Sequence, residues 1–184
     1  SSDLEKLLLN YSTPYKRAYT ELLMNVAAYN FGKEIRSDSL INMAVSEFSK
    51  DPNYLPQNFL RALIYQGIIR YHNGTLSGDA YLPIKQALDI DAEKSTLNLQ
   101  TKQLGNYYLG LIHNQNNNIN TSHEYFKSAL MLAEKLQDST ALFKTYRDFY
   151  WNRMKAMDFN TARTLLESLQ SFRLNAKEQI RDLK

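Results

Sequence analysis

The chain has 184 residues with a hydrophobic content of 43%, enough for a continuous core and typical of one domain. Its net charge is +3 with scattered basic residues, which argues against a nucleic-acid-binding face. Cysteine is absent, so disulfides, thiolate metal sites and thiol nucleophiles are excluded. No apolar run approaches the length of about 18 residues that a membrane span needs, so we expect none in this segment.

Three helices are predicted in the first 52 residues. A short helix is expected over residues 3–10. Ser12-Thr13-Pro14 starts the next, because a hydroxyl cap followed by proline is typical of a first turn, and Gly32 ends it. Ser37-Asp38-Ser39 starts the third helix, and Asp51-Pro52 stops it because the residue before proline avoids helical backbone.

The middle of the chain continues this alternation of helices and turns. A helix is predicted from Asn58 to Tyr71. Pro83 falls in the opening turn of the following helix if Asp79 caps that helix, and otherwise Pro83 predicts a late start or a kink. Residues 89–95 read as a connection, and residues 96–113 as the next helix.

The clearest helix pair lies between Gln103 and Glu134. Its first half is apolar at helical spacing, at Leu104, Tyr107, Tyr108, Leu111 and Ile112. Residues 114–118 are rich in asparagine and break the pattern. The second helix is expected to open at Asn120 or Thr121 and to run to Leu136, because Thr121 and Glu124 have the spacing of a capping box.

The last third predicts another pair. Asp138-Ser139 caps a helix that runs to about Met157, and residues 160–172 form its partner. The segment from Leu174 is predicted to be a capping helix or the first helix of a further repeat. Since no stop signal precedes Lys184, we expect the native protein to continue beyond it.

A sequence element recurs four times, with a small residue, a large apolar residue four positions on and alanine three further on. The copies start 43, 42 and 40 residues apart and are Ser37, Ile41, Ala44; Ala80, Ile84, Ala87; Ser122, Phe126, Ala129; and Ala162, Leu166, Leu169, where leucine replaces the last alanine. The corresponding positions on the preceding helices are Asn25, Gly67, Gly110 and Tyr150. Glycine in a helix costs about 1 kcal/mol relative to alanine, so we expect close helix contacts there.

Leu109-Gly110, followed by Ser122, Phe126 and Ala129, resembles the tetratricopeptide repeat (TPR). The resemblance implies an all-α fold, a right-handed α–α superhelix of about four TPR-like helix pairs plus terminal helices, in one domain over residues 1–184. Its repeats are longer than the usual length of about 34 residues. Residues 38–48 and 62–67 also resemble bacterial multi-repeat proteins, many of them envelope-anchored sensors or regulators, which implies a periplasmic or cell-envelope location.

Catalytic and metal-binding patterns are absent from the sequence. The three histidines, His72, His113 and His123, have no carboxylate at ligand spacing, although His113 and His123 could come close. No nucleotide-binding, hydrolase or metalloprotease motif occurs. We therefore expect no enzyme, no metal and no cofactor.

The TPR resemblance implies a concave groove, lined by the first helix of each pair, that binds a peptide or helix of a partner protein. The groove positions carried over are Arg61, Ile64, Ile68, Tyr71, Leu104, Tyr107, Leu111, Asn114, Lys144, Arg147, Trp151 and Met154. Arg147 and Trp151 share a helix face, and arginine and tryptophan are common at binding hot spots.

Three alternatives stay open. Ile64, Tyr107 and Leu111 could pack between neighbouring helices instead of lining a groove. The chain could be a self-assembling module whose open end pairs with a second copy as a homodimer. It could also be a helical small-ligand receptor or an enzyme with an enclosed pocket.

Overall fold

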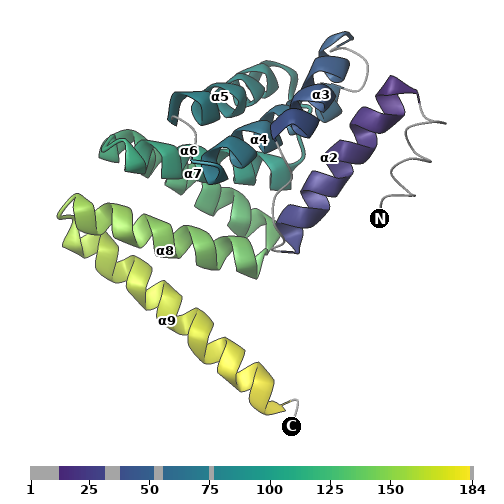
Figure 1. The fold of residues 1–184 in the computed structure, drawn as a ribbon. Coiled ribbons are helices and arrows are strands. Elements are labelled where there is room, and N and C mark those ends of the chain that lie inside the picture. Colours follow the sequence, from purple (N-terminus) through teal and green to yellow (C-terminus); the bar gives the residue numbers. More distant parts are fainter. Residues whose placement is uncertain (1–12, 32–37, 52–55, 75–76, 183–184) are drawn as a thin grey trace. The chain divides into compact units, whose positions relative to one another are not determined.

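The computed structural model describes residues 13–31, 38–51, 56–74 and 77–182 (Figure 1). Their helices are α2 (Pro14–Asn30), α3 (Asp38–Ser49), α4 (Pro56–His72), α5 (Ser77–Lys94), α6 (Leu99–Gln115), α7 (Ile119–Leu136), α8 (Ser139–Lys155) and α9 (Phe159–Asp182). Over these ranges the secondary structure is helix and turn without strands, so the all-α prediction is confirmed. The helix expected over residues 3–10 lies outside the described ranges.

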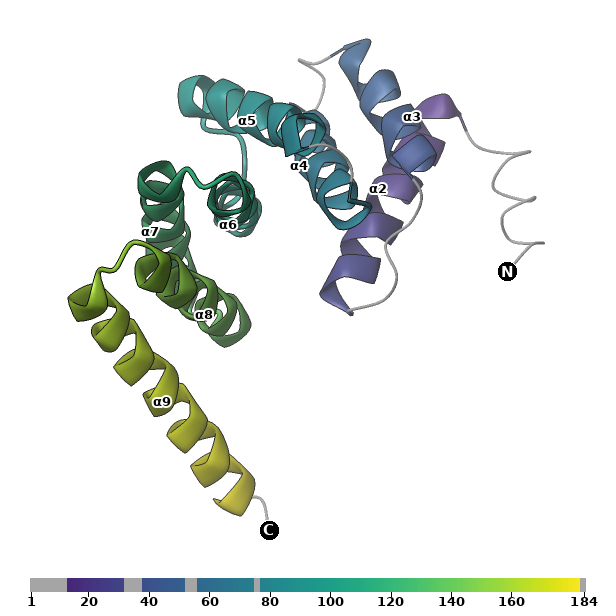
Figure 2. The same cartoon turned by 60° about the vertical axis from the view of Figure 1, so that its left-hand side comes forward.

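The chain divides into two compact units, residues 1–101 and residues 102–184, called here the N-terminal and C-terminal units. In the N-terminal unit α3 packs on α2 and α4, and α5 packs on α4 (Figure 2). In the C-terminal unit α8 packs on both α7 and α9. That both units form one domain stays a prediction.

The same helix pair occurs twice from α6 onward, and only the first three residues of α6 precede the C-terminal unit. Residues 99–115 and 139–155 are helices of equal length, and the helices that follow them begin at Ile119 and Phe159, so each element recurs after 40 residues. The turns repeat as well, since Asn117 and Met157 both have positive φ, at 61° and 57°. The 40-residue period read from the sequence is therefore a structural repeat.

Small residues sit where paired helices meet, as the repeat predicts. In the N-terminal unit a Cβ added to Gly67 would lie 2.6 Å from the backbone oxygen of Ala80. In the C-terminal unit a Cβ on Gly110 would lie 2.8 Å from the Phe126 ring, and Ser122 Oγ donates a hydrogen bond of 2.8 Å to Gly110 O. These contacts account for glycine within a helix in both pairs.

The fourth copy of the element was assigned the wrong large residue. Leu165 is buried at 5% exposure, whereas the predicted Leu166 is 39% exposed. The preceding helix carries Tyr150 where the second and third pairs have glycine, so α8 offers no gap at that position, and α9 buries Leu165 beside Ala162 instead.

Pro83 does not delay its helix. Helix α5 begins at Ser77 and runs through Pro83, so Asp79 lies in the first turn instead of capping the helix. Pro83 has no N–H for the carbonyl of Asp79, and Arg70 Nη1 donates to that oxygen instead, at 3.3 Å. A side chain from α4 thus replaces the missing backbone donor.

Other predicted boundaries were partly wrong. Helix α5 extends to Lys94 through the predicted connection, and buried Asp91 then accepts a 2.6 Å hydrogen bond from Leu97 N. Helix α7 begins at Ile119 after Asn118, so Thr121 lies inside the first turn and is not its cap. Helix α9 continues to Asp182 without the break expected near residue 173. The caps at Thr13 and Asp138 are confirmed, because both side chains accept backbone N–H groups.

Replacing Arg70 with methionine should destabilise the N-terminal unit by about 1 to 2 kcal/mol, because Arg70 joins three helices. Its Nε lies 3.2 Å from Asp38 Oδ1, and its Nη2 donates to Asn42 Oδ1 at 3.2 Å, in addition to the Asp79 carbonyl. Urea unfolding followed by circular dichroism measures the loss. Lys50→Met, which removes an exposed pair with Glu47, is the control and should change stability by less than about 0.5 kcal/mol.

Candidate functional site

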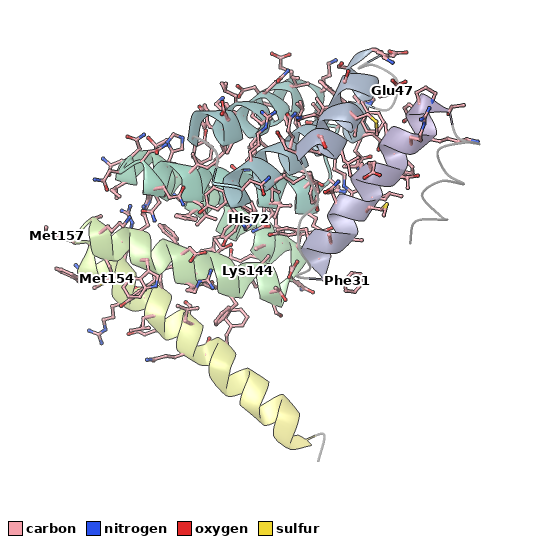
Figure 3. The ribbon with its side chains drawn as sticks, viewed as in Figure 1. Phe31, Glu47, His72, Lys144, Met154 and Met157 are labelled. Carbon is pink, nitrogen blue, oxygen red and sulfur yellow. The ribbon has the colours of Figure 1, made fainter. Side chains whose placement is uncertain are left out.

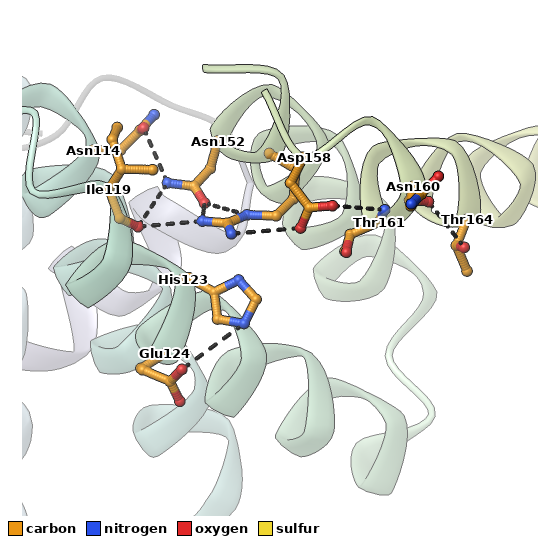
Figure 4. A network of polar contacts seen from close by, with 10 residues as sticks. Asn114, Ile119, His123, Glu124, Asn152, Asp158, Asn160, Thr161 and Thr164 are labelled. Carbon is orange, nitrogen blue, oxygen red and sulfur yellow. Dashed lines mark hydrogen bonds and ion pairs between the residues drawn. The ribbon is translucent and has the colours of Figure 1, made fainter. Parts of the chain in front are cut away.

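Two adjacent polar residues of α8, Asn152 and Arg153, are buried in the C-terminal unit at 0% and 6% exposure. Asn152 Nδ2 donates to Asn114 Oδ1 and to the carbonyl of Ile119, both at 3.3 Å (Figure 4). Arg153 Nε donates to Asn152 Oδ1 at 2.9 Å, and its Nη2 donates to Ile119 O at 3.3 Å. These bonds hold α8 to the end of α6 and to the start of α7.

The same arginine also joins α8 to the start of α9. Arg153 Nη1 lies 3.8 Å from Asp158 Oδ2, and Asp158 Oδ1 accepts a hydrogen bond of 3.2 Å from Thr161 N. Hydrogen bonds from Thr161, and then the nearby Arg153 charge, hold the pKa of Asp158 below its usual value. Burial lowers the pKa of Arg153, and Asp158 opposes that shift.

His123 lies beside this network. Its ring packs edge-on against Phe149 with centroids 5.0 Å apart, and its Nε2 lies 3.8 Å from a carboxylate oxygen of Glu124. Burial, and then the Arg153 charge, lower the pKa of His123. Within the described ranges no group of three His, Cys, Asp or Glu residues could hold a metal ion.

Lowering the pH from about 7.5 to about 5.5 should destabilise the C-terminal unit. The pKa of His123 is below its unfolded value of 6.5, so the unfolded chain binds the proton first as the pH falls. Burial, Arg153 and Lys127 resist protonation of the folded state, whereas Glu124 and Asp158 favour it. His113, whose pKa burial also lowers, contributes in the same direction.

Urea midpoints at the two pH values measure this effect, and His123→Gln should reduce the difference between them. One titrating proton contributes at most about 1.4 kcal/mol per pH unit. His72→Gln, at an exposed position in the N-terminal unit, is the matched control. If the stability of His123→Gln depends on pH as strongly as that of the wild type, the pH effect does not come from His123.

Helix α8 also carries Lys144, Arg147 and Trp151, which we call the α8 groove face; Arg147 and Trp151 are exposed and Lys144 is half-buried. Trp151, the single tryptophan of the chain, is 56% exposed. Arg147 Nε and Nη2 each donate to Asp148 at 2.9 Å, and this bonding raises the pKa of Arg147. Tyr107 Oη donates to Asp148 Oδ2 at 2.5 Å, which fixes the carboxylate from α6. Figure 3 shows Lys144 and Met154 along α8.

In the N-terminal unit the predicted groove residues lie on α4. Ile64 and Ile68 are fully buried, so they pack in the core. Arg61 and Tyr71 are half-buried. Arg61 also acts on buried Tyr65, whose pKa burial raises to about 12 against the lowering effect of the Arg61 charge.

In the C-terminal unit, some of the predicted groove residues lie close together. Tyr107 is buried at 6% exposure and reaches Arg147 through Asp148, so it packs between helices as one alternative supposed. Leu111 and Asn114 are half-buried, and Asn114 belongs to the polar network. Ligand binding by these residues stays a prediction.

Sequence reasoning did not find Asp148, Asn152 or Arg153. All three are polar residues within the apolar pattern of α8, and Asn152 and Arg153 fall on its buried side. A polar pair on the buried side of an amphipathic helix indicates bonding to neighbouring elements, because buried polar groups are generally hydrogen-bonded. That signal was present in the sequence.

Comparison with known proteins supports the fold. A crystal structure of kinesin light chain nearly identical TPR-like repeats from Podospora anserina is similar over 89% of this chain and 78% of that one, with a TM-score of 0.69 and 14% identity. The fold is that of TPR-like helical repeats. At this identity the similarity concerns the fold alone. No protein-family model and no curated protein match the sequence. Among the described helices, none is long and apolar enough to cross a membrane.

Proposed function

We propose that this chain is a protein-interaction scaffold whose C-terminal unit binds a peptide or helix of a partner protein along the α8 groove face. TPR-like folds are generally scaffolds of this kind. The observation that carries the proposal is the exposure of Trp151, at 56%, one helical turn from Arg147. Most tryptophan is highly buried, so a single exposed one beside an arginine is typical of a binding hot spot.

The surroundings hold these side chains in place before a partner arrives. Asp148 fixes the Arg147 guanidinium through two hydrogen bonds, and Tyr107 fixes Asp148. Trp151 packs edge-on against Tyr150 with ring centroids 5.1 Å apart. Side chains that are already ordered lose less entropy on binding. A suitable ligand has an apolar or aromatic side chain for Trp151 and a carboxylate for the cations of Lys144 and Arg147.

Peptide display against the full chain tests this proposal. Selected peptides should change the fluorescence of Trp151, and Trp151→Ala should weaken their binding about tenfold or more. Met131→Ala, which removes a side chain 49% exposed on α7, is the matched control and should bind as the wild type does. Selection of no peptide, or equal binding by Trp151→Ala, would contradict the proposal.

The finer role, as the sensor part of a bacterial envelope regulator, is supported by the sequence resemblance at residues 38–48 and 62–67. It predicts that the native protein is recovered with the cell envelope or the periplasm. Fractionation of the producing cells, followed by detection with an antibody against this chain, measures the location. Recovery in the cytoplasm alone would reject the envelope role and leave the scaffold proposal standing.

A further inference from the structure

The turn that follows α4 contains the one asparagine of the chain that precedes a glycine, in the dipeptide Asn73-Gly74. Both residues are exposed, so the side-chain amide of Asn73 is in contact with water. Gly74 has a positive φ of 68° and lies two residues beyond the end of α4 at His72.

The same turn follows α6, where Asn116 and Asn117 take the places of Asn73 and Gly74. Asn117 lies two residues beyond the end of α6, has a φ of 61° and is exposed, as is Asn116. In both turns the positive-φ residue donates its N–H to the carbonyl three residues earlier, at 3.4 Å. This distance is longer than the usual range of about 2.7 to 3.2 Å, so the Gly74 amide is held only weakly.

An asparagine side chain can react with the backbone nitrogen of the next residue, because closing that bond forms a five-membered ring. A side chain on the next residue hinders the approach of the two atoms, whereas glycine has none and its backbone is free to rotate. The surroundings do not close the turn either, since a Cβ placed on Gly74 would meet nothing within 4 Å. The two turns therefore share a backbone geometry and differ at the residue that controls this reaction.

We propose that Asn73 is a site of deamidation in the folded protein, with the backbone nitrogen of Gly74 as nucleophile and water as the second reactant. The Gly74 nitrogen gives up its proton to solvent and bonds to Cγ of Asn73. The bond between that carbon and the side-chain nitrogen breaks, and the nitrogen takes a proton from water and leaves as ammonia. Water then opens the succinimide ring at either of its two carbonyl carbons, which gives aspartate or isoaspartate at residue 73.

The modification changes the N-terminal unit in two ways. It adds a carboxylate, which lowers the net charge of +3 by one and places a negative charge at the end of α4, where the partial negative charge of the helix opposes it. In isoaspartate the backbone also passes through the former side chain and gains a carbon atom. The α8 groove face lies in the C-terminal unit, so this inference does not rest on peptide binding.

Mass spectrometry of the full chain, kept folded at neutral pH and body temperature for several weeks, tests the proposal. Trypsin releases residues 71–85, in which Asn73 is the single asparagine, separately from residues 103–127, which contain Asn116. Asn73 should convert about tenfold faster than Asn116 or more, because Gly74 lacks the side chain that Asn117 carries. A sample digested at time zero corrects for conversion during handling. Isoaspartate should appear with aspartate at residue 73, since hydrolysis without the ring gives aspartate alone.

Two further measurements separate the effect of the turn from that of the dipeptide. Gly74→Asn gives this turn the residue that Asn117 supplies after α6, so it should fold as the wild type does and slow the conversion of Asn73 about tenfold. A parallel incubation in urea measures the rate in the unfolded chain, and the folded chain should convert within about tenfold of that rate. A folded chain that converts only in urea overturns the proposal. Aspartate without isoaspartate, or equal rates at Asn73 and Asn116, also overturns it.

Discussion

Replacing Gly67 with alanine should destabilise the N-terminal unit by about 2 to 3 kcal/mol, although alanine is the better helix former. The added Cβ would lie 2.6 Å from the backbone oxygen of Ala80 and would also overlap the buried side chain of Ile84. The Ala80 carbonyl is part of the α5 backbone and cannot rotate away as a side chain could, so α4 and α5 must separate. Separation loosens a contact in which Ile64, Ile68 and Ile84 are fully buried.

Two other glycines of the chain serve as comparisons. Gly110→Ala should cost less, about 1 to 2 kcal/mol, because its Cβ meets the Phe126 ring at 2.8 Å and a side chain can move slightly. Gly78→Ala should stabilise by up to about 1 kcal/mol, since nothing lies within 4 Å and the position is helical. Urea unfolding by circular dichroism measures all three. A Gly67→Ala protein as stable as Gly78→Ala would show that the close approach of α4 and α5 is wrong.

These glycines also show why the fold could be predicted. A glycine on one helix and a small residue on the next are local requirements of close packing, so Gly67 with Ala80 and Gly110 with Ser122 were visible as a periodic pattern. The fourth copy failed because Tyr150 fills the corresponding position, and the choice between Leu165 and Leu166 then depends on how α9 rotates against α8. Such a rotation is set by three-dimensional packing and has no local sequence signal.

The candidate site was less predictable for a similar reason. The exposed pair of Arg147 and Trp151 follows from helical spacing on one element. By contrast, the burial of Arg153 depends on partners from α7 and α9, and the tie between Tyr107 and Asp148 joins residues 41 positions apart. Pro83 is a further case, because its tolerance within α5 depends on Arg70 from a different helix. A polar pair on the buried side of a helix indicates that such bonds form, but it does not identify the long-range partners.

Replacing Arg153 with methionine should destabilise the C-terminal unit by about 3 to 4 kcal/mol. Methionine keeps most of the apolar stem but removes the donors to Asn152 Oδ1 and to the Ile119 carbonyl, and the cation beside Asp158. Asn152 is fully buried, so water cannot replace the lost donor without opening the unit. The guanidinium also lies 5.7 Å from the centre of the Phe149 ring, and this contact is lost too.

Urea unfolding followed by Trp151 fluorescence reports on α8 itself, because Trp151 is the single tryptophan of the chain. Arg163→Met is the matched control, since Arg163 forms an exposed pair with Glu167 on α9, and it should change stability by less than about 0.5 kcal/mol.

A titration of His123 by NMR distinguishes the loss of the Arg153 contacts from a general loss of packing. Arg153 is the second cause, after burial, of the lowered pKa of His123, so Arg153→Met should raise that pKa part of the way toward its usual value while burial still holds it down. Arg163→Met should leave it unchanged. If the pKa of His123 does not move in folded Arg153→Met, the guanidinium does not lie beside the imidazole. The bonds of Arg153 to Asn152 and Ile119 would then be wrong as well.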